Sequence, residues 1–222
     1  MSRIVRHVVA SLVVVLAACS SAPPAPEWQS NAKAALDRAV AAHLGGDTRV
    51  ASAEFDLARR ELARTGRADL VAMAELTRCA VQVASLDVGP CAGFEKMRDD
   101  ATPAERAYAD YLLNRVQSGD VALLPEHHRP FAAGALSGDA ETAALRAVED
   151  PLARLVATGV LFQDSRASPS TIALAVDTAS AQGWRRPLLA WLGVQLALAE
   201  KAGDNAGAER LRRRIALVQD MK

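Results

Sequence analysis

Apolar residues along this chain recur at spacings of three and four, in runs that end at short glycine-containing breaks. The first run carries Ala32, Ala35, Leu36 and Ala39, and it stops at Gly45-Gly46-Asp47. Such spacing places the apolar side chains on one face of an α-helix. No stretch alternates apolar and polar residues over a useful length, and aromatic residues, which strands favour, make up only 4% of the chain. The sequence therefore predicts an all-α fold.

Breaks and capping signals divide the chain into successive helices. Two further apolar runs end at Thr65-Gly66 and at Val88-Gly89-Pro90, which predicts three helices of about 15 to 20 residues before residue 90. A short helix is expected around residues 94–97. Thr102-Pro103-Ala104-Glu105 predicts the start of another helix, because threonine caps the first turn and glutamate reaches back to it. Ser168-Pro169 predicts a later helix start in the same way.

A Gly-Asp pair followed by an alanine four residues after the aspartate occurs three times. In each copy we expect the glycine to end one helix in the left-handed conformation and the aspartate to cap the next helix. The alanine then lets the two helices approach closely. The copies are Gly46, Asp47 and Ala51; Gly138, Asp139 and Ala143; and Gly203, Asp204 and Ala208.

This corner resembles the turn of a tetratricopeptide repeat. The first copy also has Phe55 and Ala58 at the spacings that this family uses in its second helix. The resemblance implies stacked antiparallel helical hairpins with a concave surface for a peptide or a helix. The copies lie 92 and 65 residues apart, which are not multiples of the repeat length of about 34 residues. An irregular helical bundle is therefore the alternative.

The segment of residues 187–202 is apolar nearly all round, with Trp191 and Leu192 at its centre. A helix without a polar face is expected to be buried on several sides. The sequence therefore predicts a central helix in the C-terminal half, with Leu211, Ile215 and Val218 packed against it.

The N-terminus has the features of an export signal. Arg3 and Arg6 precede the apolar residues 8–16, a run too short to span a bilayer. The run ends in Leu16-Ala17-Ala18-Cys19, which resembles the lipobox of bacterial lipoproteins. The resemblance implies that residues 1–18 are removed and that Cys19 carries the lipid.

Further implications of the lipoprotein resemblance concern location. Ser20 follows the cysteine, where an aspartate commonly marks retention at the inner membrane. The resemblance thus implies the outer membrane of a Gram-negative bacterium, with the domain facing the periplasm. Residues 19–26 are rich in proline and are expected to form a semi-extended tether, followed by an all-helical domain over residues 27–222. We expect membrane contact through the lipid anchor alone.

The charge balance argues against a nucleic-acid partner. The chain has 26 basic and 26 acidic residues, and removal of residues 1–18 leaves 24 basic residues against 26 acidic ones. Nucleic-acid binding depends on an excess of lysine and arginine. The expected partners are the membrane, through the anchor, and an envelope protein.

Cys79 and Cys91 are the cysteines that remain beyond the lipobox. Disulfides form and persist in an oxidising compartment such as the periplasm, and the chain between the two residues has room to double back. A disulfide that fixes one inter-helix corner is therefore predicted. The alternative is two buried, unreactive thiols.

The chain lacks the familiar motifs of nucleophilic, phosphate-binding and zinc-dependent catalysis, so no catalytic residue, metal site or cofactor is predicted. Adjacent His127 and His128 point about 100° apart on a helix and do not form one chelating face. We interpret them as part of a surface loop or helix cap. His43 lies near a helix end, where a charged imidazole is favourable.

Surface features complete the prediction. Arg210, Arg213 and Arg214 share a face of the last helix, which is either a solvated face or a docking patch for an acidic partner or for anionic head groups. Trp28 is expected to pack on the first hairpin. The function expected is that of a lipoprotein acting as a non-catalytic scaffold or adaptor for protein–protein interaction in envelope assembly. The alternative is an envelope enzyme or small-ligand carrier whose site has no familiar motif.

Overall fold

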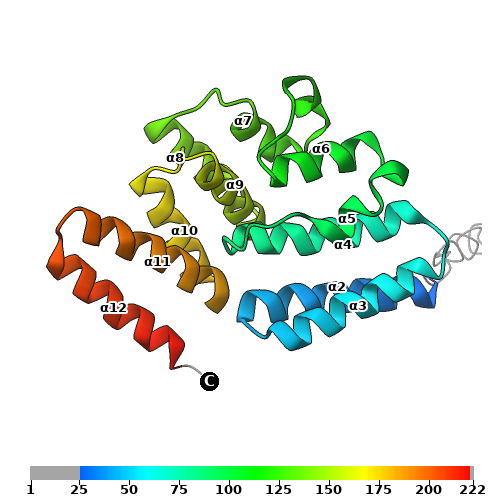
Figure 1. Ribbon diagram of the computed structural model, residues 1–222, viewed down its shortest axis with the longest axis horizontal. Helices are drawn as coiled ribbons and strands as arrows, with labels where there is room; N and C mark the ends of the chain where they lie inside the picture. The colour runs from blue at the N-terminus through cyan, green and yellow to red at the C-terminus, as the bar shows by residue number, and fades with distance from the viewer. Residues whose placement is uncertain (1–25, 221–222) are drawn as a thin grey trace, which may run out of the picture.

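The computed structural model describes residues 26–220, and every element in that range is helical (Figure 1). The predicted all-α fold is therefore confirmed. The predicted lipobox and most of the tether lie outside the described residues. The longer helices are α2 (Glu27–Gly45), α3 (Thr48–Ala63), α4 (Ala68–Ala84), α6 (Pro103–Leu112), α8 (Gly138–Ala147), α9 (Pro151–Gln163), α10 (Pro169–Ala181), α11 (Arg185–Lys201) and α12 (Asn205–Gln219). The shorter ones are α5 (Ala92–Glu95), η1 (Arg98–Asp100), η2 (Ser118–Leu123), η3 (Glu126–His128) and α7 (Arg129–Ala132).

Consecutive helices pack side by side as neighbouring pairs. In Figure 1, α2 lies along α3, α10 along α11, and α11 along α12. Helix α4 is the central element, since it contacts α3 on one side and α6 and α9 on the other. Its buried residues Ala72, Ala80 and Ala84 are small, which lets these neighbours approach. Helix α4 thus joins the first hairpin to the rest of the array.

Helix starts follow the capping signals in the sequence. Thr102 Oγ1 accepts a hydrogen bond from the Glu105 amide at 3.3 Å, and Glu105 Oε2 accepts one from the Thr102 amide at 2.7 Å. This pair forms the predicted capping box of α6. Ser168 caps α10 through a hydrogen bond from the Thr171 amide.

Two of the three Gly-Asp corners have the geometry expected of a hairpin turn. Gly46 ends α2 in the left-handed conformation with φ of 96°, and Asp47 caps α3 by accepting a hydrogen bond from the Val50 amide at 2.9 Å. Ala51 is buried between the helices. The last copy repeats this arrangement, with Gly203 left-handed, Asp204 as the cap of α12 and Ala208 buried.

The prediction for the middle copy fails in all but one respect: Gly138 is left-handed, with φ of 58°, but the rest of the corner is absent. Helix α8 begins at Gly138 itself, so that glycine does not end a preceding helix, and the capping position belongs to Ser137. Asp139 therefore lies inside the first turn, and Ala143 is exposed. The preceding helix α7 ends at Ala132, too far back along the chain for the two helices to form a tight hairpin.

Helix α11 is buried over only part of its length, which corrects the prediction of a central helix covered on several sides. Pro187, Leu188, Trp191 and Leu192 are buried, whereas Leu198 is 40% exposed. The buried half packs into the core, where the Trp191 indole donates a hydrogen bond to the carbonyl oxygen of Ala84 at 3.1 Å. The exposed half extends beyond that core, with α12 alongside it (Figure 1).

The start of α11 also reaches the first hairpin. Arg186 donates hydrogen bonds to the carbonyl oxygen of His43 at 2.7 Å and to Thr48 Oγ1 at 2.6 Å. The neighbouring Trp184 packs against the cluster that contains Leu44 and Phe55. The C-terminal helices are therefore fastened to the N-terminal hairpin.

Candidate functional site

A groove lies between α4, α6, the η2–η3 segment and the first half of α9, and we call it the central groove. Its cavity volume is about 650 Å³, within the range of roughly 300–1,000 Å³ that is usual for ligand sites. Helix α4 supplies Met73, Leu76, Thr77 and Ala80, and α6 supplies Ala104, Glu105 and Tyr108. The η2–η3 segment supplies Leu123, Leu124, Pro125, His127 and His128, and the α9 side supplies Asp150, Leu152, Ala153 and Val156.

The lining of the central groove is mainly apolar, and part of it faces solvent. Met73, from α4, is 47% exposed, and Leu123, from the η2–η3 segment, is 41% exposed. Large apolar side chains that line a hollow and stay in contact with water are typical of a binding surface. Methionine adds adaptability, because its unbranched side chain fills irregular space.

His128 is the main departure from the sequence-based interpretation of this segment. A surface loop was expected, and His127 is indeed exposed, but His128 is only 1% exposed. The short η3 helix places its ring beside α6, with the ring centroid 4.8 Å from that of Tyr111 and 5.7 Å from that of Tyr108. Tertiary packing of two tyrosines therefore buries a histidine that the local sequence assigns to the surface.

Burial also fixes the charge of these aromatic groups. It lowers the pKa of His128 to about 3, with a smaller contribution from His127. It raises the pKa of Tyr108 and of Tyr111 above the ordinary value for tyrosine. At neutral pH, His128 and both tyrosines are therefore uncharged, and this wall of the groove carries no positive charge from them.

The two carboxylates of the groove are both helix-capping groups. Glu105 Oε2 accepts hydrogen bonds from the amide and hydroxyl of Thr102. Asp150 Oδ1 accepts hydrogen bonds from the amides of Leu152 and Ala153 at 2.7 and 2.9 Å. In each carboxylate, one oxygen accepts these capping hydrogen bonds, and they hold the side chain in place at the groove surface. This arrangement suits binding of an apolar group with a polar edge.

Sequence reasoning did not anticipate the groove, because its walls come from four separate segments. The local signal was the sequence Leu123-Leu124-Pro125, in which two large apolar residues precede a proline outside any long amphipathic run. In the structure Leu124 is buried in the core while Leu123 turns outward to the groove.

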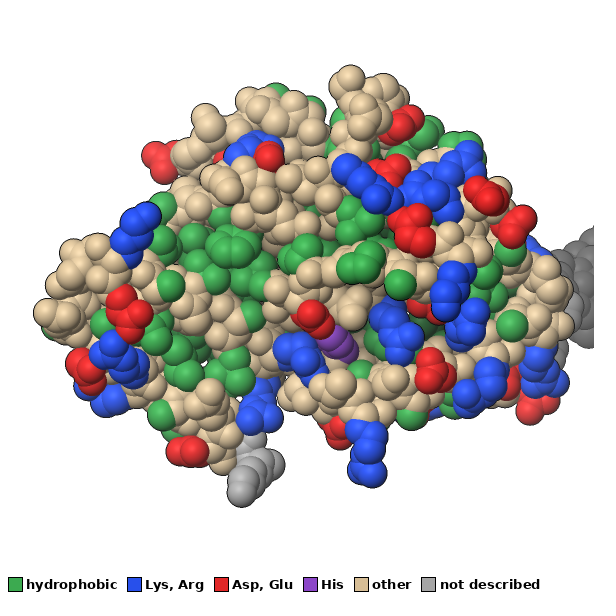
Figure 2. All heavy atoms as spheres, in the orientation of Figure 1, with side chains coloured by type: hydrophobic (Ala, Val, Ile, Leu, Met, Phe, Trp, Pro, Cys, Tyr) green, Lys and Arg blue, Asp and Glu red, His purple; other side chains and the backbone are tan. Residues whose placement is uncertain are grey.

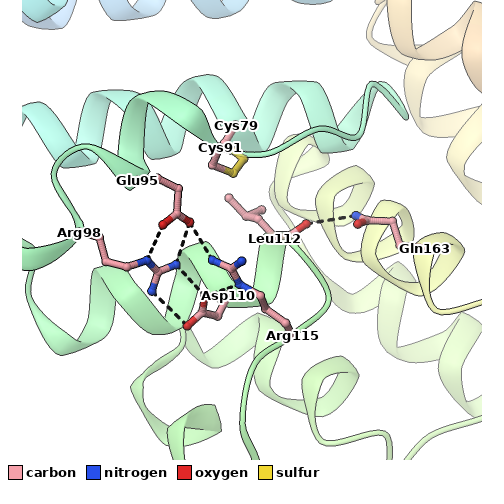
Figure 3. The surroundings of a disulfide bond; sticks show 8 residues. All are labelled: Cys79, Cys91, Glu95, Arg98, Asp110, Leu112, Arg115 and Gln163. Carbon is pink, nitrogen blue, oxygen red and sulfur yellow. Dashed lines mark hydrogen bonds and ion pairs between the residues drawn. A yellow bond between two sulfur atoms is a disulfide. The ribbon is translucent and has the colours of Figure 1, made fainter.

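The predicted cysteine pair lies on another side of α4. The sulfur atoms of Cys79 and Cys91 are at bonding distance and their Cα atoms are 5.6 Å apart, as the predicted disulfide requires. Cys79 belongs to α4, and Cys91 precedes α5 (Figure 3). The pair holds the start of α5 against α4.

Four charged residues close to this corner form a ring of hydrogen bonds (Figure 3). Arg98 donates to Glu95 at 2.7 Å and to Asp110 at 2.7 Å, and Arg115 donates to the same two carboxylates, also at 2.7 Å. Hydrogen bonding to Arg98 lowers the pKa of Glu95. Against the opposing effect of burial, hydrogen bonds from Arg98 and Arg115 also lower the pKa of Asp110. The ring links α5, η1 and α6.

A second, polar hollow of about 430 Å³ lies beside the disulfide, between α3, α4 and α5. Four of its charged residues form two pairs: Arg59 Nε lies 3.3 Å from Glu75 Oε1, and Arg78 Nη2 lies 3.7 Å from Asp56 Oδ1. Glu75 is buried, and Gly93 packs directly on its carboxylate, leaving no room for a Cβ atom. These charges therefore hold the helices together.

The predicted arginine face of α12 is apart from the central groove. Arg210, Arg213 and Arg214 are exposed, and Arg214 Nη2 lies 3.5 Å from Ser180 Oγ. The intervening Arg212 instead pairs with Glu200 at 2.6 Å and with Glu209. Figure 2 shows basic and acidic side chains interleaved over the right-hand half of the face drawn, and hydrophobic surface over α10 and α11 on the left. The molecular face drawn in Figure 2 therefore carries both positive and negative side chains.

His43 and Trp28 can also be placed. His43 is 8% exposed, and burial, followed by the nearby Arg186, lowers its pKa to about 4. The expected charged imidazole is therefore wrong, because the helix end that carries it is covered by α11. Trp28 packs on the first hairpin, against a cluster that includes Ala32 and Leu62.

Among residues 26–220, no three histidine, cysteine, aspartate or glutamate side chains lie close enough to hold a metal ion together. None of the helices in that range has both the length and the apolarity that a membrane crossing requires. No known protein family, curated protein sequence or solved structure matches this chain significantly. The site must therefore be interpreted from its own chemistry.

Proposed function

We propose that this protein is a lipid-anchored envelope protein that binds other proteins through the central groove. The anchor is proposed from the lipobox-like Leu16-Ala17-Ala18-Cys19, and Ser20 favours the outer membrane with the domain facing the periplasm. The proline-rich residues 20–26 give the domain reach from the lipid surface. The role is that of a non-catalytic adaptor in envelope assembly.

One observation carries the binding role: solvent reaches large apolar side chains inside a concave site. Met73 on α4 and Leu123 at the end of η2 both line the groove and remain nearly half exposed. Burying such side chains against a partner is favourable by about 25 cal/mol per Å² of apolar surface. Paired helices and two corners with Gly-Asp-Ala chemistry also support the likeness to tetratricopeptide arrays, which bind peptides and helices on their concave face.

The anchor is tested by mass spectrometry of the protein from its native membrane. The expected N-terminal fragment begins at Cys19 with diacylglycerol on sulfur and an acyl group on nitrogen. The variant Cys19→Ser is expected to keep its leader and to incorporate no labelled palmitate. Wild-type protein that retains residues 1–18 and a free thiol at position 19 would refute the anchor.

The groove is tested by photo-crosslinking in living cells. A benzoylphenylalanine residue replaces Leu123 in the groove or, as a control, Leu217 on α12, which is 69% exposed and lies on an element outside the groove. We expect a discrete crosslinked protein from position 123 and none of the same mass from position 217. Identical products from both positions, or none from 123, would contradict a binding role for the groove.

A small-ligand carrier is the second candidate, and the groove volume of about 650 Å³ favours it, since this is the size of a drug-like site. Native mass spectrometry of the purified protein distinguishes the two. A bound small molecule that is lost in the Leu123→Ser variant supports the carrier, whereas ligand-free protein supports the adaptor.

A further inference from the structure

We infer that the segment seated in the central groove is cationic as well as apolar: an amphipathic peptide or helix with lysine or arginine beside its apolar face. This inference rests on the proposed binding role of the groove and specifies the chemistry of its partner.

The charged side chains that line the central groove are acidic. Glu105 and Asp150 line it, and none of the described residues that line it is lysine or arginine. His128 adds no positive charge at neutral pH, because burial lowers its pKa to about 3. The apolar floor is therefore bordered by two negative groups.

Neither of these two carboxylates forms an ion pair with a described residue. Three buried or half-buried carboxylates elsewhere, Glu95, Asp110 and Glu141, each lie 2.7 Å from an arginine nitrogen. Within residues 26–220, Glu105 and Asp150 have no ion-pair partner, and their bonded oxygens accept only from groups at their own helix starts. The second oxygen of each, Glu105 Oε1 and Asp150 Oδ2, accepts no hydrogen bond from residues 26–220 and is available to a cation of the partner.

The geometry of the walls fits an amphipathic occupant. Met73 and Leu123 offer apolar contact from two separate segments, while Glu105 lies in the first turn of α6 and Asp150 caps α9. A helix with leucines at i, i+3, i+4 and i+7 presents an apolar stripe with polar residues along its edges. Lysines on those edges then meet carboxylates, whereas glutamates are repelled. Each carboxylate lies at the positive N-terminal end of its helix, α6 or α9, which partly offsets its negative charge. The attraction of each carboxylate for a cation of the partner is therefore moderate.

The test measures peptide binding to the full-length protein in nanodiscs of zwitterionic phosphatidylcholine, with empty nanodiscs as the blank. Two fluorescein-labelled peptides share the same leucine spacing, and one carries lysine where the other carries glutamate. Fluorescence anisotropy is expected to show the lysine peptide binding about tenfold more tightly than the glutamate peptide, with the difference shrinking in high salt.

Matched variants remove the charges but keep the caps. Glutamine serves in a capping box and asparagine caps a helix as well as aspartate does. Glu105→Gln and Asp150→Asn are each expected to weaken binding of the lysine peptide about threefold. The control Asp47→Asn changes an equivalent cap on α3, outside the groove, and is expected to leave binding unchanged.

The outcomes separate this inference from the function it rests on. If both peptides bind equally and Leu123→Ser weakens both, the groove binds apolar segments without regard to charge, and the cationic partner is overturned. If neither peptide binds, or Leu123→Ser has no effect on binding, the binding role of the groove fails too. If the Glu105→Gln and Asp150→Asn variants still bind the lysine peptide more tightly than the glutamate peptide, by the same factor as the wild type, then Glu105 and Asp150 are not the groups that recognise the cation.

Discussion

The carbonyl oxygen of Val83 lies 2.5 Å from the position that a Cβ atom would occupy on Gly159. Helices α4 and α9 therefore meet at a point where only hydrogen fits. Because the obstacle is backbone, which cannot rotate away, Gly159→Ala forces the helices apart. We expect a loss of about 3 kcal/mol in the free energy of unfolding, measured by urea denaturation.

A matched glycine provides the control. Gly193 lies inside α11 and is exposed, and a Cβ atom added to it would meet no other atom within 4 Å. Gly193→Ala is expected to stabilise the protein by about 0.5–1 kcal/mol, because alanine is the better helix former. Equal effects at positions 159 and 193 would show that the α4–α9 contact is not tight.

The corners differ in what their aspartates contribute. Asp47→Ala removes the hydrogen bond to the Val50 amide and is expected to cost about 1 kcal/mol of stability. Asp139→Ala is expected to cost only a few tenths of a kcal/mol, since Asp139 lies within the first turn of α8 and does not cap it. Chemical denaturation of the two variants under the same conditions gives the comparison. A larger loss of stability in Asp139→Ala than in Asp47→Ala would show that Asp139 does cap α8.

The Cys79–Cys91 pair closes a loop with a sequence separation of 12 residues. A loop of this size predicts a stabilisation of about 3 kcal/mol from the restricted unfolded chain. Dithiothreitol is expected to lower the denaturation midpoint of the wild-type protein and to leave a Cys79→Ala, Cys91→Ala double variant unchanged. Thiol titration of the unfolded oxidised protein should detect neither cysteine, and two free thiols there would contradict the bond.

Two buried histidines predict a loss of stability in mild acid. The ordinary histidine pKa is about 6.5, and burial lowers it to about 3 for His128 and about 4 for His43. Below pH 6.5 the unfolded chain binds protons that the folded chain does not, so stability is full above that pH and falls as the pH drops towards the folded values. We expect each histidine to account for about 1–2 kcal/mol between pH 7 and pH 5.

Urea denaturation at both pH values tests this, with the difference between them as the readout. His128→Gln is expected to remove about half of that difference, whatever its effect on stability at pH 7. His127→Gln changes the exposed neighbour and is expected to leave the difference intact. A pH dependence that persists in a His43→Gln, His128→Gln double variant would assign it to other groups.

The parts of the fold that sequence predicts well are those fixed by neighbouring residues. The capping box of Thr102 and Glu105 and the corner at Gly46 need only a few consecutive residues, and both have the expected geometry. Gly138-Asp139 is the same dipeptide as at the other two corners, but no helix ends directly before it. The pair therefore lies at the start of α8 without forming a hairpin.

The candidate site depends on contacts that local patterns do not encode. His128 becomes buried because Tyr108 and Tyr111, on a different helix, pack against its ring. The groove itself requires α4, α6, η2–η3 and α9 to meet, and its boundary residues are ordinary leucines, a methionine and two capping carboxylates. Each of these residues is explained locally by a helix face or a cap, so its shared location emerges only from the tertiary arrangement.

The hydrogen bonds from Arg186 to His43 and Thr48 have a consequence for the order in which the chain folds. The first hairpin needs only neighbouring residues, whereas these contacts span 143 and 138 residues of chain and are expected to form late. Until then the hydroxyl group of Thr48, and the side of the His43 carbonyl oxygen that the Gly46 amide does not use, are open to water. A chain in which α11 has not yet docked would thus have an unfinished N-terminal edge, by which incompletely folded molecules differ from mature ones.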